Sequence, residues 1–190
     1  DITAEAKRLV FGAVGIDGIA GPSEILVVAD KKTNINEIGT SLVGQSEHGL
    51  ESQCILVTKH KEIINKVQKN IVSNLENLPR KKIAFKSLKK HGLIILCEND
   101  KQIIEVVNEV GPEHCEINIS NYKKYLRYIV NAGSICIGKY SPMAVTDYNS
   151  GSQHTLPTLG SSKYSSGLNV SDFYKKISYV NLSKKGVAKI

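Results

Sequence analysis

Glu24-Ile25-Leu26-Val27-Val28-Ala29 is the stretch of this sequence that decides the fold. A continuous apolar run of this length is typical of a strand that is buried on both faces of a parallel sheet. Asp30-Lys31-Lys32 marks its end. Residues 34–48 then carry apolar side chains at helical spacing, and residues 53–57 form a second apolar run. The sequence therefore predicts a strand, a helix and a strand in succession.

The same alternation continues on both sides of this unit. A short helix is expected over residues 3–11, before the first strand. Further helical patterns cover residues 63–75, 83–88, 100–110 and 122–130, and further apolar runs occupy residues 93–97, 115–119 and 134–137. Alternating strands and helices form a parallel or mixed sheet that is flanked by helices. We therefore predict a Rossmann-like α/β domain over residues 1–138.

The composition of the sequence changes after Gly138. Residues 139–168 are polar, rich in Gly and Ser, and without a periodic pattern. A loop of this length is usually functional or disordered, and its Asp, His and aromatic residues favour function. A final helix is predicted from Val170 to Val180 because apolar residues recur there at helical spacing. Residues 139–190 are therefore expected to form an active-site loop and the start of a C-terminal helical region.

Composition limits the cellular setting and the partners. No apolar run approaches the length of a membrane span, and residues 1–7 do not resemble a signal peptide, so we expect a soluble cytoplasmic protein without a membrane partner. The four cysteines stand far apart without a C-x-x-C pair, which predicts buried free thiols. The net charge of +7 comes mainly from lysines on expected helix surfaces, so no nucleic acid is expected as a partner. A basic binding module is the alternative, and salt-dependent retention on DNA or RNA would reveal it.

Gly111-Pro112-Glu113-His114 is the first candidate for chemistry. Proline fixes its own φ and disfavours helix in the residue before it, so the helix should end here and Glu113 and His114 should begin the next strand. Junctions between elements are where α/β proteins keep their chemistry. A carboxylate and an imidazole titrate at different pH, so the pair suits two successive proton transfers. The alternative is that both are surface residues.

Gln45 and His48 are candidates for metal ligands. They are three residues apart at the end of a predicted helix, so their side chains should project from one face, as two ligands of one ion must. Asp147 could add an oxygen from the loop. Imidazole, carboxylate and amide donors suit zinc or another divalent first-row ion better than calcium. The alternative is a surface pair or a helix cap.

The motifs together resemble those of one enzyme family. They are Gly15-Ile-Asp17, Ala20-Gly-Pro-Ser-Glu24, Gln45-Ser-Glu-His-Gly49, Gly111-Pro-Glu-His114, Asp147-Tyr148, and Gly151 through His154-Thr-Leu-Pro-Thr158. Their order and approximate spacing are those of the histidinol dehydrogenases, which the sequence resembles over essentially its whole length. That family carries out the last steps of histidine biosynthesis. The resemblance implies an oxidation of L-histidinol to L-histidine through the aldehyde, with two NAD molecules at a single site.

The resemblance also implies roles for individual residues. Gln45, His48 and Asp147 match three of four zinc ligands, and the fourth is a histidine from the other subunit of a homodimer. The zinc would chiefly anchor the substrate. Glu113 and His114 match the catalytic pair, with His114 taking the protons of the alcohol and of the gem-diol and Glu113 activating water. The residues expected to contact L-histidinol are Ser23, Gln45, His48, His114, Asp147 and His154.

Some features depart from the family pattern. Family members are longer, and the resemblance places most of the NAD site before Asp1 and the last zinc ligand in a C-terminal segment. Thr146 stands where Gly is usual, which puts the backbone at Asp147 in question, and Gln153 stands where Asn is usual. The sequence lacks G-x-G-x-x-G, so it gives no independent sign of dinucleotide binding. The alternative to an active enzyme is a non-catalytic fragment that keeps the fold and a partial zinc site.

Overall fold

The chain folds around one parallel sheet, as the apolar runs predicted. The computed structural model describes residues 2–148 and 150–189, without the side chain of Asp147. Its strands are β1 (Glu24–Ala29), β2 (Gln53–Thr58), β3 (Gly92–Leu96), β4 (His114–Asn118) and β5 (Ser134–Ile137). All neighbouring pairs are parallel, in the order β3-β2-β1-β4-β5. The predicted α/β fold is therefore confirmed.

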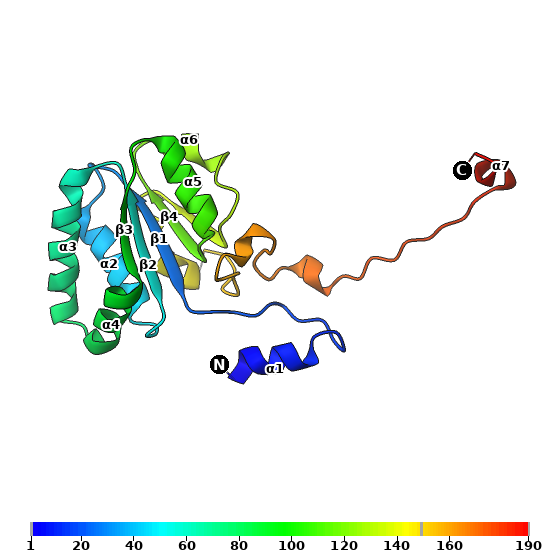
Figure 1. The fold of residues 1–190 in the computed structure, drawn as a ribbon, viewed down its shortest axis with the longest axis horizontal. Coiled ribbons are helices and arrows are strands. Elements are labelled where there is room, and N and C mark those ends of the chain that lie inside the picture. Colours follow the sequence, from blue (N-terminus) through cyan, green and yellow to red (C-terminus); the bar gives the residue numbers. More distant parts are fainter. Residues whose placement is uncertain (1, 149, 190) are drawn as a thin grey trace.

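Helices cover both faces of the sheet (Figure 1). The α-helices are α1 (Ile2–Val10), α2 (Ile35–Ser46), α3 (Lys61–Glu76), α4 (Lys81–His91), α5 (Asp100–Val110), α6 (Lys123–Leu126) and α7 (Lys184–Val187). Short 3-10 helices are η1 (Met143–Asp147), η2 (Ser161–Lys163) and η3 (Val170–Phe173). α2, α3 and α4 lie on one face, and α5 and α6 lie on the other, so the central strands are covered on both sides.

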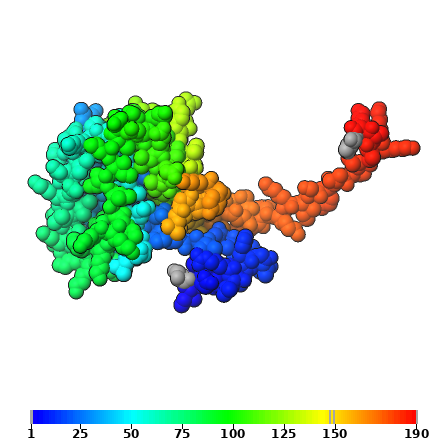
Figure 2. Space-filling view, viewed as in Figure 1, coloured from blue at the N-terminus to red at the C-terminus, as the bar shows by residue number. Residues whose placement is uncertain are grey.

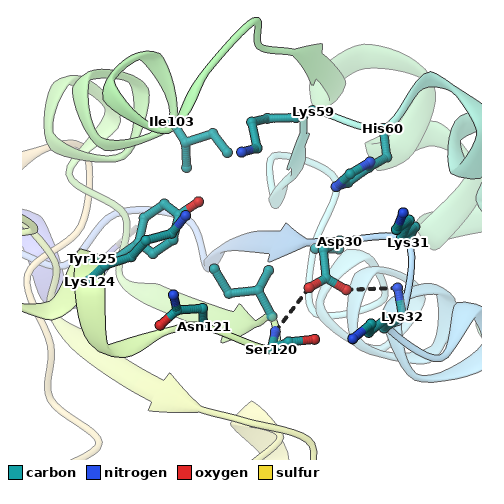
Figure 3. A pocket seen from close by; sticks show the side chains of 12 residues that line it. Asp30, Lys31, Lys32, Lys59, His60, Ile103, Ser120, Asn121, Lys124 and Tyr125 are labelled. Atoms are coloured by element: carbon teal, nitrogen blue, oxygen red, sulfur yellow. Dashed lines mark hydrogen bonds between the residues drawn. The ribbon is translucent and has the colours of Figure 1, made fainter.

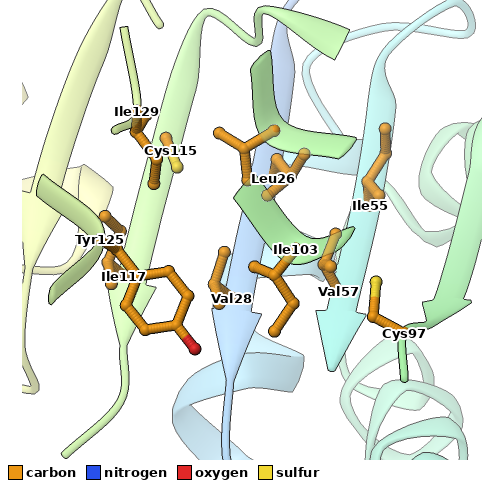
Figure 4. Close-up of a cluster of buried hydrophobic side chains, with 11 residues drawn as sticks. Leu26, Val28, Ile55, Val57, Cys97, Ile103, Cys115, Ile117, Tyr125 and Ile129 are labelled. Carbon is orange, nitrogen blue, oxygen red and sulfur yellow. The ribbon is translucent and has the colours of Figure 1, made fainter. Parts of the chain in front are cut away.

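Two hydrophobic clusters form the core, one on each face. In β1, Leu26 and Val28 belong to the cluster under α5 and α6, where Ile103 of α5 and Tyr125 of α6 meet them (Figure 4). The alternate residues of β1, among them Val27, belong to the cluster under α2 and α3. Both sets are almost fully buried. This double burial explains why β1 reads as a continuous apolar run.

The helix predicted over residues 122–130 is largely absent. Only α6, four residues long, is helical there. The backbone N–H groups of Val130 and Asn131 donate to the side-chain oxygen of Asn108, at 2.8 and 3.1 Å. This contact with α5 takes the N–H groups that a longer helix would use internally, so the helix ends early.

The helix predicted over residues 170–180 is also wrong. The structure has the single turn η3 followed by an extended segment, and helix returns only at α7. The apolar side chains of Phe173, Ile177 and Val180 are exposed, and the segment leads away from the body of the molecule (Figures 1 and 2). An isolated amphipathic helix is marginal without a surface on which to bury its apolar face. Among the described residues, this segment meets no such surface.

Two compositional predictions can be compared with the structure. Cys54, Cys97, Cys115 and Cys136 are all free and buried, as predicted. Burial raises the pKa of the Cys54 thiol to about 12, so the thiol is inert at neutral pH. Within the described ranges, no helix is both long enough and apolar enough to cross a membrane.

The direction of α2 brings the candidate residues together. In a parallel β-α-β unit the helix runs back from the carboxyl edge of the sheet to the amino edge. The end of α2, with Gln45, therefore returns to the edge at which β1 and β4 begin. β4 lies beside β1 with His114 opposite Ile25. The starts of β1 and β4 and the end of α2 thus share one edge.

Candidate functional site

The candidate site lies at the amino edge of the sheet, opposite the edge that the general rule favours. Ligands of open α/β sheets usually bind outside the carboxyl ends of the strands. Glu113 and His114 instead precede and begin β4, and Ser23 precedes β1. The expectation that this junction is a usual place for chemistry was therefore wrong, although the residues do converge there.

The end of α5 fixes where the acid and the imidazole stand. Gly111 follows α5 in the left-handed conformation with φ of 55°, and its N–H donates to the carbonyl of Val107 at 2.9 Å. A Cβ atom at this position would lie 2.7 Å from the Oγ of Ser162, so the space also requires glycine. The carbonyls of Pro112 and Glu113 then accept N–H groups at the start of β5, at 2.9 and 2.8 Å. The backbone is thus held on both sides before His114.

Glu113 and His114 form a close pair that is not on the surface. Glu113 Oε1 lies 3.9 Å from His114 Nε2, which is an ion-pair distance if the ring is protonated. His114 is 7% exposed and Glu113 is partly buried, so the alternative of two surface residues is wrong. A carboxylate beside an imidazole favours the charged ring electrostatically. The pair can therefore accept a proton on the ring and stabilise it there.

Glu24 holds Glu113 through a reciprocal contact between two strand starts. The N–H of Glu24 donates to Glu113 Oε2 at 2.9 Å, and the N–H of Glu113 donates to Glu24 Oε2 at 3.2 Å. Glu24 Oε1 also accepts the N–H of Leu159 at 3.1 Å. Burial raises the pKa of the Glu24 carboxyl, and these N–H groups partly oppose that rise. Glu24 thus ties β1, β4 and the loop together.

The side-chain amide of Gln45 is buried without a hydrogen-bond partner among the described residues. Its side chain is 1% exposed, and neither its Oε1 nor its Nε2 has a hydrogen-bond partner among the described residues. A buried amide without partners costs about 1–3 kcal/mol, so such groups are rare in native proteins. The amide oxygen is a suitable donor to a divalent first-row ion. The amide oxygen of Gln45 is therefore suited to be one ligand of a bound metal ion.

His48 lies next to the start of β1, outside the helix. α2 ends at Ser46, so the prediction that the helix continues to His48 was wrong. His48 follows in the turn, where its N–H donates to the carbonyl of Gln45 at 3.2 Å. Its ring is exposed, with Nδ1 3.4 Å from the Oγ of Ser23. The structure thus brings His48 and Ser23 together, as expected of two residues of one site.

The loop residues are described only in part. Asp147 is the last residue of η1, and its side chain lies outside the described part of the structure. Thr146 Oγ1 donates to the carbonyl of Met143 at 2.6 Å. Among the described residues, Leu159 is the one non-glycine residue with positive φ, so Thr146 occupies its position without the backbone strain that the departure from glycine raised.

His154 stands at the beginning of a segment that reaches the site. The ring of His154 is exposed. A few residues later, the Oγ1 of Thr158 accepts the N–H of Gly21 at 2.5 Å, just before β1. The loop therefore packs against the amino edge of the sheet.

The described side chains do not complete a metal site. Among the described residues, which leave out Asp1 and the side chain of Asp147, no three His, Cys, Asp or Glu residues are grouped so that they could hold a metal ion. Gln45 supplies a buried amide and His48 an exposed imidazole near it in sequence. A tetrahedral site would need two more donors.

The carboxyl edge of the sheet carries a pocket of about 200 Å³ that is lined by several charged side chains (Figure 3). Lys59 and Lys124 both form ion pairs with Asp100. Asp30 accepts the N–H groups of Ser120 and Lys32, at 2.9 and 2.7 Å. None of the residues predicted for the site lies in this pocket.

Two buried carboxylates were not singled out from the sequence. Glu24 ends the motif Ala20-Gly-Pro-Ser-Glu24, in which only Ser23 was predicted to contact the substrate. Glu116 interrupts the apolar run of residues 115–119, and it is 4% exposed. The sequence did contain a sign of a functional or structural role for Glu116, namely a charged residue inside an otherwise apolar strand. Glutamate is almost never buried without partners.

The known proteins that are similar to this chain in sequence or structure, and that are reported next, all have the same name. A family model described as histidinol dehydrogenase matches residues 2–190. The histidinol dehydrogenase of Pelagibacter ubique is 55% identical over 185 residues, which are 97% of this chain and 43% of that protein. That of Listeria monocytogenes is 45% identical over 186 residues, which are 98% of this chain and 44% of that protein. The crystal structure of histidinol dehydrogenase from Elizabethkingia anophelis matches with a TM-score of 0.90 and 36% identity, covering 98% of this chain and 43% of that one. The chain spans less than half the length of the relatives that it matches.

Proposed function

Because this chain belongs to the histidinol dehydrogenase family, we propose that the complete protein, meaning this chain with whatever sequence accompanies it in nature, oxidises L-histidinol to L-histidine. The reaction passes through the aldehyde, consumes two NAD molecules and serves histidine biosynthesis. The observation that carries the proposal is the Glu113–His114 pair, at 3.9 Å, on the same sheet edge as the amide of Gln45, which has no hydrogen-bond partner among the described residues. The proposed chemistry needs both a proton-transfer pair and donors for a metal ion.

Gln45, His48 and Asp147 would hold a zinc ion together with a histidine from the second subunit of a homodimer. The buried amide of Gln45 supports this assignment, because the ion would satisfy an oxygen that no described residue satisfies. When bound, zinc would act as a template that anchors the imidazole and amino groups of the substrate. Ser23 and His154 would add contacts to the substrate, and Ser23 is favoured by its position 3.4 Å from His48.

In the first oxidation, His114 would accept the hydroxyl proton of histidinol as the carbon loses a hydride, for which NAD would be the acceptor. Alcohol becomes aldehyde, so two electrons and two protons leave the substrate in this step. The carboxylate of Glu113 stabilises the imidazolium that forms. Because Glu24 fixes Glu113 Oε2, the other oxygen, Oε1, is the one that faces the ring.

Between the oxidations, water adds to the aldehyde to give a gem-diol. Glu113 takes a proton from the attacking water, and the protonated ring of His114 gives its proton to the aldehyde oxygen, so that His114 is again a base for the second oxidation. In the second oxidation, His114 would take a hydroxyl proton of the gem-diol as its carbon loses a second hydride, for which a second NAD would be the acceptor, and the carboxylic acid results. Anchoring by the same groups holds substrate, aldehyde and product in one place.

The remaining assignments concern the setting of the enzyme. We propose a cytoplasmic homodimer whose site is completed by the partner subunit, with neither nucleic acid nor membrane as a partner. The pattern of charge supports the expectation that nucleic acid is not a partner, because the lysines of the sequence are spread over helix surfaces.

The test is turnover of L-histidinol by the complete protein. We expect two NADH per histidinol consumed, loss of activity after zinc is removed by a chelator, and recovery when zinc is returned. Substituting Glu105→Gln on the exposed side of α5 is a matched control that should change nothing. Absence of NADH formation by zinc-loaded protein would refute the proposal.

A further inference from the structure

Glu116 is a buried carboxylate on the same face of the sheet as the candidate site. It follows His114 by two residues in β4, so both side chains point to the face covered by α2. Its strand neighbours Cys115 and Ile117 belong to the cluster on the opposite face. Glu116 is 4% exposed. A carboxylate in this position needs partners to offset its burial.

The partners of Glu116 come from two other segments of the candidate site. A single oxygen, Oε1, accepts the backbone N–H of Met143 at 2.6 Å and the hydroxyl of Ser41 at 3.1 Å. Met143 begins η1, and η1 ends at Asp147. Ser41 lies on α2 one helical turn before Gln45. One carboxylate oxygen therefore joins the strand of His114, the helix of Gln45 and the turn of Asp147.

The contacts require an acceptor more than a charge. Burial raises the pKa of the Glu116 carboxyl, with a smaller rise from Glu37, and the donors Met143 and Ser41 oppose these effects. Because both bonds meet at one oxygen, a glutamine amide oxygen could accept them equally well.

The side chain of Met143 does not replace this contact. It is buried in the cluster that contains Val27 and Leu42, so it anchors η1 to the core. An apolar anchor is non-directional, whereas the hydrogen bond from the N–H fixes the orientation of the first turn. The orientation of η1 fixes the backbone position of its last residue, Asp147.

We propose that Glu116 is a positioning residue, which holds η1 and α2 in fixed relation to β4 so that Asp147, Gln45 and His114 face one site. This inference rests on the proposed function, because it concerns the same zinc and substrate site. It assigns Glu116 no contact with the substrate.

The test compares four variants of the complete protein. Glu116→Leu removes the acceptor, Glu116→Gln keeps it, Ser41→Ala removes one of the two contacts, and Glu105→Gln is a surface control. The measurements are zinc affinity by chelator competition, KM and kcat for L-histidinol, and the rate of tryptic cleavage at the exposed Lys139 in metal-free protein.

We expect Glu116→Leu to weaken zinc binding by about 10- to 100-fold, as the loss of supporting contacts around metal ligands does elsewhere. KM should rise more than kcat falls, and cleavage at Lys139 should accelerate because η1 is released. Glu116→Gln should stay near the wild type in all three measurements. Ser41→Ala should weaken zinc binding by about 2- to 10-fold, the size of one hydrogen bond.

Three results would overturn the inference. Unchanged zinc affinity in Glu116→Leu with only a lower Tm would make the residue merely structural. Equal losses in the leucine and glutamine variants would show that the charge matters instead of the acceptor. If the leucine variant does not fold, Ser41→Ala decides, and zinc affinity equal to that of Glu105→Gln overturns the inference.

The proposed function can fail separately. Wild-type protein that binds zinc and leaves histidinol unoxidised would refute the enzymatic activity, while zinc affinities and cleavage rates would still test Glu116. Wild-type protein that binds no zinc would refute both.

Discussion

The side chain of Glu113 has two roles, one structural and one chemical. Its Oε2 accepts the N–H of Glu24, and its Oε1 faces the ring of His114. The first contact needs only an acceptor, whereas water activation needs a base. A substitution that keeps the acceptor and removes the base can therefore separate the two.

Glu113→Gln should slow the second oxidation much more than the first. The amide oxygen can still accept the N–H of Glu24, but the side chain no longer takes a proton from water. Because general-base catalysis contributes about 10²- to 10⁴-fold, hydration of the aldehyde should slow by a factor in that range. Rapid-quench analysis of aldehyde and acid in a single turnover checks this. An equal loss in both oxidations would contradict the role of Glu113 in hydration.

Gln45→Met should stabilise the metal-free protein and abolish its stabilisation by zinc. The buried amide lacks partners among the described residues, and replacing such a group with an apolar one of similar shape removes a cost of about 1 kcal/mol. The measurement is Tm with a chelator and with zinc. Gln68→Met, at an exposed position of α3, is the control. A lower Tm in chelator would show that Gln45 has an unidentified structural partner.

At the scale of elements, the site depends on where helices end. α2 ends at Ser46, which leaves His48 in a turn beside Ser23. α5 ends at Val110, and the left-handed Gly111 redirects the chain towards Glu113. These endings place side chains that helical periodicity alone would misplace.

Gly111→Ala should destabilise the protein and reduce turnover. A side chain at φ of 55° costs about 1–2 kcal/mol, and its Cβ would also lie 2.7 Å from the Oγ of Ser162. The strain should displace the backbone before Glu113, so kcat should fall together with Tm. Gly44→Ala within α2 is the matched control, because its Cβ would meet nothing within 4 Å and alanine favours helix by about 1 kcal/mol. Equal Tm for the two variants would contradict this account.

At the scale of the whole molecule, buried carboxylates make stability depend on pH. Burial raises the pKa of Glu24 and Glu116 above the unfolded value near 4.5. The folded state therefore binds their protons more tightly than the unfolded state does. Their contribution to stability is complete below about pH 4.5 and is lost as pH rises through the folded pKa values.

Glu116→Gln should therefore reduce this loss. Its amide oxygen keeps both hydrogen bonds and does not ionise, so Tm of the variant relative to the wild type should rise as pH increases from about 4.5 to 8. Each unit by which the folded pKa is raised corresponds to about 1.4 kcal/mol. Thermal unfolding over this pH range checks the prediction, with Glu105→Gln as control. A difference that shrinks with increasing pH would contradict it.

The Rossmann-like sheet was predictable because apolar runs and the spacing of apolar residues are local properties of a sequence. The run from Glu24 to Ala29 shows by itself that a strand is buried on both faces, and residues 100–110 show a helix. The helix expected over residues 170–180 was not predictable in the same way. Its apolar spacing is real, but a helix forms only where another surface covers that face.

Sequence alone determined the strands, most of the helices and the motifs that resemble the histidinol dehydrogenases, because each depends on residues close together in the chain. Only the tertiary structure decided that Glu24 and Glu113 hold each other across 89 positions, and that Glu116 joins Ser41 and Met143. The strand order places β4 beside β1, and the return of α2 brings Gln45 to the same edge. These contacts arise from how elements pack in space, and a linear pattern of polar and apolar residues does not encode that arrangement.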